Sequence, residues 1–270
     1  MNNIVQRSEF DSLYRDICQG AFYPVFQPIY GLTSQEASGL EVLTRWKRER
    51  HVEESFRMIE EHGLNALFTK VLFNKLTNYV DSFPTSFTFI SVNVSPSHLS
   101  SVSFVFDVTP LLKACQQRGI TLWLELTENT AYSSRLCDQM MTKFNVNVCK
   151  KLGAKIALDD FGVAYHREES IIRFIRPDIV KLDRSMLGKK SEQYGHVWNS
   201  LRNWKKIYQF ELVAEGIETV DDLTFIKNQQ IAYAQGYFLH GPTKLTDLRP
   251  NSTQRCVDCA ALPLMCAVPF

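Results

Sequence analysis

Lys155-Ile156-Ala157-Leu158-Asp159-Asp160-Phe161-Gly162 combines an apolar run with two adjacent carboxylates and a glycine. The apolar run predicts a buried strand, so the two aspartates would lie at its C-terminal end. Two neighbouring negative charges are costly there unless a cation lies between them. Carboxylate oxygens at this density suit hard divalent cations such as Mg²⁺ or Mn²⁺, and the alternative interpretation is an ordinary polar turn.

The same pattern, a short apolar run that ends on polar side chains, recurs along the chain. Such runs cover residues 39–43, 87–93, 122–128, 179–183, 212–218 and 234–237, after an opening run at 26–29. Apolar residues at helical spacing lie between them, in residues 64–76, 140–152 and 198–208. Strands that alternate with helices predict a parallel sheet, and about eight strand candidates favour an α/β fold of the TIM-like (β/α)8 barrel type.

The polar residues at these strand ends predict an active site. In a (β/α)8 barrel the C-terminal ends of the strands converge on one mouth, which carries the chemistry. The residues expected there are Glu41, Asn93, Glu125, Asp159, Asp160, Lys181, Glu215 and Gln235. One polar residue at a strand end means little, but this many on one barrel mouth favour an active site over unrelated turns.

Length and composition set the remaining expectations. The chain has 270 residues, 45% of them hydrophobic, which suits one barrel domain with a sizeable core. A net charge of +1 gives no electrostatic basis for binding duplex nucleic acid. No apolar stretch is long enough for a bilayer and no secretion signal is visible, so we expect no membrane association and a cytoplasmic location.

We expect three segments: a helical lead-in at residues 1–20, the barrel domain at 21–250 and a tail at 251–270. The tail contains Cys256, Cys259 and Cys266. Cys256 and Cys259 have the spacing of half a zinc site, but no second pair or nearby histidine follows. A poorly ordered tail is the interpretation that we favour.

Several short motifs, taken together, resemble the EAL-domain cyclic di-GMP phosphodiesterases over about residues 26–242. The motif that names the family appears as Glu41-Val42-Leu43 and continues as Thr44-Arg45-Trp46. The other matching stretches, in the family's order, are 92–96, 125–128, 159–162, 181–183, 214–219 and 235–237. Their number and order make the resemblance specific.

The resemblance implies an EAL barrel whose first strand is antiparallel to the rest. It implies hydrolysis of cyclic di-GMP to linear pGpG with two metal ions, Mg²⁺ or Mn²⁺, and a homodimer. The implied metal ligands are Glu41, Asn93, Glu125, Asp159 and Asp160, with Glu215 as a possible further ligand. The implied substrate contacts are Gln27, Arg45, Asp183, Glu218 and Gln235.

The roles of three further residues follow from the chemistry and from the resemblance. Two cations would neutralise the phosphodiester and activate a water between them. Lys181 would then order that water or offset developing charge, and Glu215 is a candidate general base if it is not a ligand. Glu128 is implied as the anchor of the loop after Asp160.

That loop departs from the family pattern Asp-Phe-Gly-Thr-Gly-Tyr-Ser-Ser-Leu. Here Val163 replaces the threonine, Ala164 replaces a glycine, and His166 and Arg167 replace two serines. Alanine disfavours a positive φ that glycine adopts freely. Two hypotheses therefore remain: an active phosphodiesterase, supported by the complete set of metal carboxylates, and a catalytically weak regulator that binds cyclic di-GMP or a protein.

Overall fold

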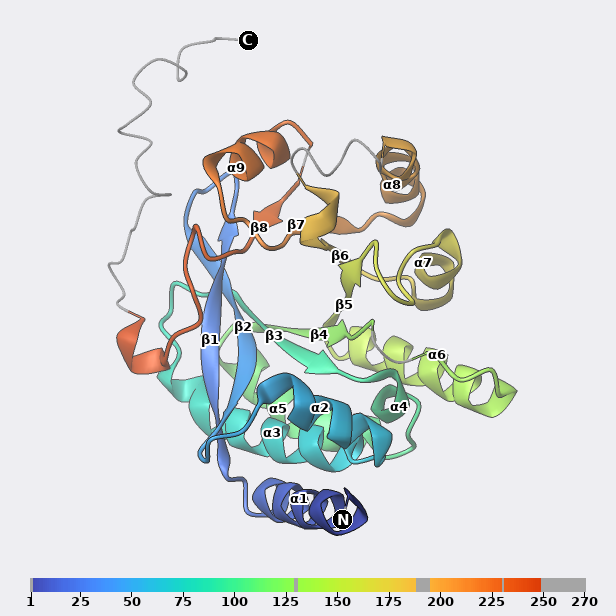
Figure 1. Ribbon diagram of the computed structural model, residues 1–270. Helices are drawn as coiled ribbons and strands as arrows, with labels where there is room; N and C mark the ends of the chain where they lie inside the picture. Colours follow the sequence, from blue (N-terminus) through green and yellow to red (C-terminus); the bar gives the residue numbers. More distant parts are fainter. Residues whose placement is uncertain (1, 129–130, 188–194, 230, 249–270) are drawn as a thin grey trace.

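The strands close into a barrel in the computed structural model, which describes residues 2–128, 131–187, 195–229 and 231–248 (Figure 1). The strands are β1 (Phe22–Gly31), β2 (Ala37–Trp46), β3 (Phe89–Val94), β4 (Thr121–Leu126), β5 (Lys155–Phe161), β6 (Ile179–Leu182), β7 (Glu211–Ala214) and β8 (Tyr233–Ala234). Each pairs with the next, and β8 pairs with β1. The predicted barrel is confirmed.

Strand β1 runs against the other strands, as the family resemblance implied. It pairs antiparallel with both β2 and β8, whereas every pair from β2–β3 to β7–β8 is parallel. A short turn joins β1 to β2, which only an antiparallel pair allows. The register sets Gln27 opposite Glu41, so the inverted strand still brings a polar side chain to the level of the motif.

Most of the helices surround the barrel and cover its outer face (Figure 1). The helices are α1 (Asn2–Cys18), α2 (Val52–Glu61), α3 (Asn65–Tyr79), α4 (Pro96–Leu99), α5 (Phe104–Gln117), α6 (Leu136–Lys151), α7 (Glu169–Ile175), α8 (Gly195–Tyr208) and α9 (Val220–Lys227). Short 3-10 turns are η1 (Val80–Ser82), η2 (Arg184–Met186) and η4 (Leu245–Asp247). Helix α4 begins with a capping residue and a proline: Ser95 accepts a hydrogen bond from the His98 amide, and Pro96 occupies the first position.

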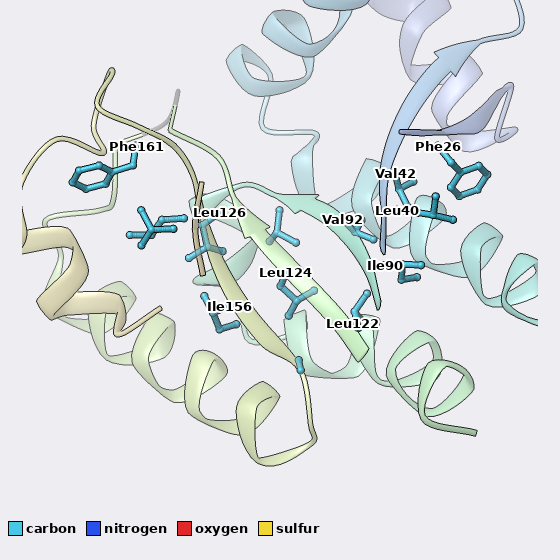
Figure 2. Packing of buried hydrophobic residues seen from close by; sticks show 14 of the residues in the cluster. Phe26, Leu40, Val42, Ile90, Val92, Leu122, Leu124, Leu126, Ile156 and Phe161 are labelled. Carbon is cyan, nitrogen blue, oxygen red and sulfur yellow. The ribbon is translucent and has the colours of Figure 1, made fainter. Parts of the chain in front are cut away.

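Alternation along each strand separates two layers of side chains. Outward-facing residues such as Leu122, Leu124 and Ile156 belong to the main core beneath the helices (Figure 2). Inward-facing residues form a separate apolar floor, made of Ile29, Phe89, Trp123, Ala157, Ile179 and Val213 with Tyr233 packed against it. The floor is tight, because the rings of Phe89 and Trp123 stack at 3.7 Å and a Cβ on Gly39 would lie 2.1 Å from the Phe89 ring.

Helix α6 corrects one prediction from the sequence. The apolar series at Met140, Met141, Phe144, Val148 and Leu152 predicted the buried face, yet Met140 and Phe144 are exposed. The buried residues are Thr142, Asn145, Val146 and Cys149. Asn145 explains the rotation, because its amide donates to the carbonyls of Leu99 and Ser101 beneath the helix.

Two further expectations concern membrane association and the C-terminal tail. No helix in the described part of the chain combines the length and the apolar character needed to cross a bilayer. The three tail cysteines lie outside the described residues, so the expectation of a tail from residue 251 stays a prediction. The same holds for the domain limits at residues 21 and 250.

Candidate active site

A polar layer lies directly above the apolar floor. Two residues beyond each floor position, the parallel strands turn a polar side chain inward, because side chains alternate with a period of two. The residues of this layer are Glu41, Ser91, Glu125, Asp159, Lys181, Glu215 and Gln235. The structure therefore gathers most of the predicted strand-end residues at one level of one barrel.

Lys181 lies at the centre of this layer. Its Nζ atom is 2.7 Å from Glu215 Oε1, 2.8 Å from Asp159 Oδ1 and 3.0 Å from Glu125 Oε1. Glu41 Oε2 is 3.7 Å away. Burial alone would lower the pKa of Lys181, but the surrounding carboxylates outweigh burial and hold this pKa well above its usual value. The lysine is therefore a fixed positive charge.

One ammonium group does not balance the four carboxylates around it. Burial, the largest cause, raises the pKa of Glu125 to about 8 and that of Glu215 well above its ordinary value, although Lys181 opposes both shifts. Glu125 is fully buried, and its contacts in the described residues include the Lys181 ammonium, 3.0 Å from Oε1, and the Ser91 hydroxyl. An ionised carboxylate has about four lone-pair sites, so Glu125 keeps capacity to bind a cation beside these contacts.

Glu41 is held in place by two amides. Asn93 Nδ2 donates to Glu41 Oε1 at 3.3 Å, and Gln235 Nε2 donates to Glu41 Oε2. These contacts join β2 to β3 on one side and to the end of β8 on the other. The motif glutamate is thus oriented by residues from three parts of the barrel.

A second acidic group lies beside the first. Glu128, Asp159 and Asp160 each offer a carboxylate oxygen within 4.8 Å of the others. Burial and then the charges of Asp159 and Glu128 raise the pKa of Asp160 to about 7. Asp160 also has a positive φ of 44°, a conformation that aspartate tolerates better than most residues. Glu128, expected as a loop anchor, therefore also lies where it could bind a cation.

The donor set fits divalent cations. It is oxygen-rich and negatively charged, as hard cations require, and it includes the amide of Asn93. The residues that could hold one ion are Glu41, Asn93, Glu125 and Asp159, and those that could hold another are Asp159 and Asp160 with Glu128 or Glu215.

Of the predicted substrate contacts, Arg45 and Gln27 lie at the cavity or the edge of the polar layer, whereas Asp183 and Glu218 make other contacts. Arg45 lines the cavity described below, and its Nη1 donates to the Thr44 carbonyl at 2.9 Å. Gln27 Nε2 donates to the His240 carbonyl at 3.0 Å, at the edge of the polar layer. Asp183 accepts from the Ser185 amide at 2.8 Å, and Glu218 pairs with Arg184 outside the polar layer. The structure does not bring Glu218 into contact with the carboxylates.

A cavity of about 660 Å³ opens over the acidic groups. From the predicted site it includes Glu41, Arg45, Asn93, Glu128, Asp159 and Asp160. One wall was not predicted: helix α2 contributes Val52, Glu53, Phe56, Arg57 and Glu60. The amphipathic spacing of these residues could have predicted a helix, but no feature of the sequence shows that its face would border the mouth of the barrel.

His166 is a second residue whose place the sequence did not reveal. It is fully buried, its Nδ1 donates to the Asp159 carbonyl at 2.6 Å, and its Nε2 lies 3.5 Å from the hydroxyl of Tyr132. Burial lowers the pKa of His166, which favours the neutral ring. The side chain thus supports the backbone of a candidate ligand and does not point at the carboxylates.

The rest of the loop after β5 is tightly turned. The Gly162 amide donates to the His166 carbonyl at 2.7 Å, and Ala164 adopts a positive φ of 43°. The replacement of a family glycine by Ala164 therefore falls at a position where glycine would be favoured.

Comparisons with known proteins give a consistent result. The sequence profile of a family described as EAL domain matches residues 11–242. The chain is 27% identical over 246 residues to a probable cyclic di-GMP phosphodiesterase, PdeG, of Escherichia coli, covering 87% of this chain and 47% of that protein. It is 31% identical over 225 residues to the cyclic di-GMP phosphodiesterase TpdA of Vibrio parahaemolyticus, covering 80% and 36%. The chain thus spans less than half the length of these curated relatives.

Solved structures agree on the fold. A PaMucR phosphodiesterase in complex with cyclic di-GMP has a TM-score of 0.70 at 22% identity, covering 88% of this chain and all of that one. The Bacillus subtilis YkuI protein, solved with cyclic di-GMP and calcium, also has a TM-score of 0.70 at 22% identity, covering 87% and 57%. At this identity the likeness establishes the barrel architecture.

Proposed function

The chain belongs to the EAL domain family, and on that premise we propose that it hydrolyses cyclic di-GMP to linear pGpG with the help of divalent cations. The observation that supports this most strongly is the inward-facing carboxylate layer around Lys181. A module that only binds a nucleotide does not need that many buried carboxylates, because an anionic phosphodiester repels them. A hydrolase that holds two cations does need them.

Lys181 and Glu215 have roles in the proposed reaction beside those of the candidate cation ligands. When bound, two cations would neutralise the phosphodiester and lower the pKa of a water between them. Lys181 keeps its proton, so it orients Asp159 and Glu215 and offsets negative charge. Glu215 has a raised pKa and can accept a proton at its carboxylate, which makes it the candidate general base.

The cavity above this layer fits a nucleotide substrate. Its volume is within the range of about 300–1,000 Å³ that small-molecule sites occupy. Arg45 brings a positive charge to the mouth, and Phe56 offers an aromatic ring on the α2 wall. A dinucleotide has anionic phosphates, which Arg45 could bind, and flat bases, against which Phe56 could stack.

The second candidate function is a catalytically weak regulator that binds cyclic di-GMP or a protein. The observation in its favour is the loop after β5, where Ala164 has a positive φ and Val163 lacks the hydroxyl of the family threonine. A loop that holds Asp160 less firmly would lower cation occupancy and turnover while leaving the nucleotide cavity intact.

The test is incubation of the purified chain with cyclic di-GMP and Mg²⁺ or Mn²⁺, followed by chromatography for pGpG. We expect pGpG with either cation, none after chelation, and none from Asp159→Asn. The matched control is Asp81→Asn, which makes the same change at an exposed position and should retain full activity. Tight binding of cyclic di-GMP without pGpG would support the regulator instead.

Three further properties belong to this proposal. A cytoplasmic location follows from the substrate, which is an intracellular second messenger. A homodimer is proposed because the loop after β5 presents the exposed ring of Tyr165 close to the site. The net charge of +1 argues against binding to duplex nucleic acid. Sedimentation analysis tests the dimer, and a Tyr165→Ser variant should weaken it.

A further inference from the structure

Helix α1 lies outside the barrel and packs against α3 (Figure 1). Leu13 and Ile17 are fully buried and anchor it to the main core. Because α1 is fixed to the core, it can hold in place the segments that pack against its other faces. What it touches is the segment that begins helix α2.

The principal contact is a buried ion pair between α1 and the residues before α2. Arg50 donates from Nε to Asp16 Oδ2 at 2.9 Å, and its Nη2 is 2.8 Å from the same oxygen. Arg50 also donates to Ser12, and Arg48 Nε lies 3.6 Å from Asp16 Oδ1. The Asp16 side chain is 1% exposed and that of Arg50 is 15% exposed, so solvent screens the pair weakly.

A second contact holds the other end of α2. The ring of Phe10 lies 4.6 Å from the ring of His62, the residue that caps the C-terminus of α2. His62 in turn contacts the Met58 carbonyl at 2.9 Å through Nδ1. Helix α1 therefore touches the chain just before α2 and just after it.

Helix α2 is the wall of the cavity that the sequence did not predict. Val52, Glu53, Phe56, Arg57 and Glu60 face the cavity, whereas Ser55 and Ile59 are its buried residues. Phe56 also packs edge-on against Phe68 of α3, with ring centroids 5.2 Å apart. Residues 47–51, which contain Arg48 and Arg50, are the segment of chain that connects β2 to this wall.

We propose that α1 is a clamp that positions α2, and that the Asp16–Arg50 pair thereby sets the affinity of the cavity for its nucleotide. The identity of that nucleotide as cyclic di-GMP rests on the proposed function. The clamp does not touch the carboxylates on β2 to β7, so it governs substrate affinity and leaves cation binding and the chemical step unchanged. Asp16 and Arg50 are positioning residues in this scheme.

The expected change in KM can be estimated from the fraction of molecules in which α2 occupies its wall position. Without the ion pair, α2 occupies its wall position for only a fraction of the time. The apparent affinity falls by that fraction, and we expect KM to rise about three- to tenfold. The kcat value at saturating substrate stays within about twofold, because bound substrate restores the wall position.

The experiment compares Asp16→Asn, Arg50→Gln and the double variant with the matched control Asp11→Asn, an exposed aspartate on the same helix. Hydrogen exchange of amides 52–61 reports the position of α2 without any substrate. Kinetics with cyclic di-GMP give KM and kcat, and a Mg²⁺ titration gives the activation midpoint. Thermal melts identify any variant that fails to fold.

The expected result is faster exchange in residues 52–61 for both single variants, a raised KM, and unchanged kcat and Mg²⁺ midpoint. The double variant should differ little from either single variant, since the Asp16–Arg50 pair is the principal contact and those of Arg48 and Ser12 are secondary. Unchanged exchange in 52–61 overturns the clamp, and faster exchange with an unchanged KM overturns its link to affinity. If the wild type does not turn over cyclic di-GMP, the proposed function fails, while the exchange data still decide the clamp.

Discussion

Lys181 and Glu215 face each other inside the barrel, with Nζ and Oε1 2.7 Å apart, and both side chains come from inward positions at the ends of neighbouring strands. The same ammonium group contacts Asp159 and Glu125. In the metal-free protein this lysine is therefore the principal counter-charge for a group of buried carboxylates. Four predictions follow from this arrangement and from the loop beside it.

Lys181→Gln should abolish hydrolysis and destabilise the metal-free protein, because it leaves buried carboxylates without their cation. Added Mg²⁺ should restore much of that stability, since a cation that binds only the folded state shifts unfolding by mass action. Melting temperatures in EDTA and in Mg²⁺ measure this, and the gap should be wider than in the wild type. Lys113→Gln, at an exposed site, serves as the control, and an equal gap in both variants contradicts the prediction.

Glu125 should make the metal-free protein less stable as the pH rises. Its pKa is raised from 4.5 to about 8, so within that window the folded protein holds a proton that the unfolded chain has released. Stability is therefore greatest at the acid end of the window and falls towards its alkaline end. Melts in EDTA from about pH 5 to about pH 8 test the slope.

Glu125→Gln should reduce that slope without abolishing it, because the pKa values of Asp160 and Glu215 are raised in the same direction. It should also remove activity and leave the metal-free protein at least as stable as the wild type at neutral pH. If activity is lost while stability is kept or increased, the buried carboxylate of Glu125 serves catalysis and not folding. Glu36→Gln, an exposed control, should keep the slope. A Glu125→Gln protein with the wild-type pH slope would show that other groups cause it.

Ala164→Gly should stabilise the protein by about 1 kcal/mol, because Ala164 has a positive φ that glycine adopts without strain. Combined with Val163→Thr it should raise activity at limiting Mg²⁺ and have little effect at saturation. Chemical denaturation and a Mg²⁺ titration measure the two effects. Ala114→Gly on helix α5 is the opposite control and should destabilise by about 1 kcal/mol. Overlaying titration curves would mean that the native loop works well as it is.

His166→Phe should weaken Mg²⁺ activation, because the ring no longer donates to the Asp159 carbonyl. A hydrogen bond worth about 1 kcal/mol corresponds to roughly a fivefold shift in the Mg²⁺ midpoint. The kcat value at saturating Mg²⁺ should change less. His196→Phe, on the exposed side of α8, is the control, and equal midpoints for the two variants would remove His166 from the site.

The sequence predicted the barrel because apolar and polar residues recur along it with the spacing of strands and helices. The run that ends at Asp159 and the run that ends at Lys181 both turn every second residue inward, so apolar floor and polar layer were implicit in the pattern. The antiparallel direction of β1 came from the family resemblance. Placing Glu41, Glu125 and Glu215 at one mouth needed only the rule that strand ends converge.

What the sequence did not predict depends on packing between elements. The apolar series of α6 could not show that Asn145 would turn the helix by bonding two carbonyls beneath it. The spacing of Phe56 on α2 could not show which surface that helix would meet. His166 contacts a backbone carbonyl, and such a contact depends on the path of a loop that has no periodicity.

The apolar floor determines how a ligand can enter and leave the cavity above it. Phe89 and Trp123 stack on each other from the neighbouring strands β3 and β4, and with the other floor residues they form a buried apolar cluster below the carboxylates. The floor therefore closes the cavity from below, and under the proposed function cyclic di-GMP and its product would use the same opening. Accumulating pGpG should then compete with cyclic di-GMP for entry, so that initial rates fall as product builds up even while substrate remains in excess.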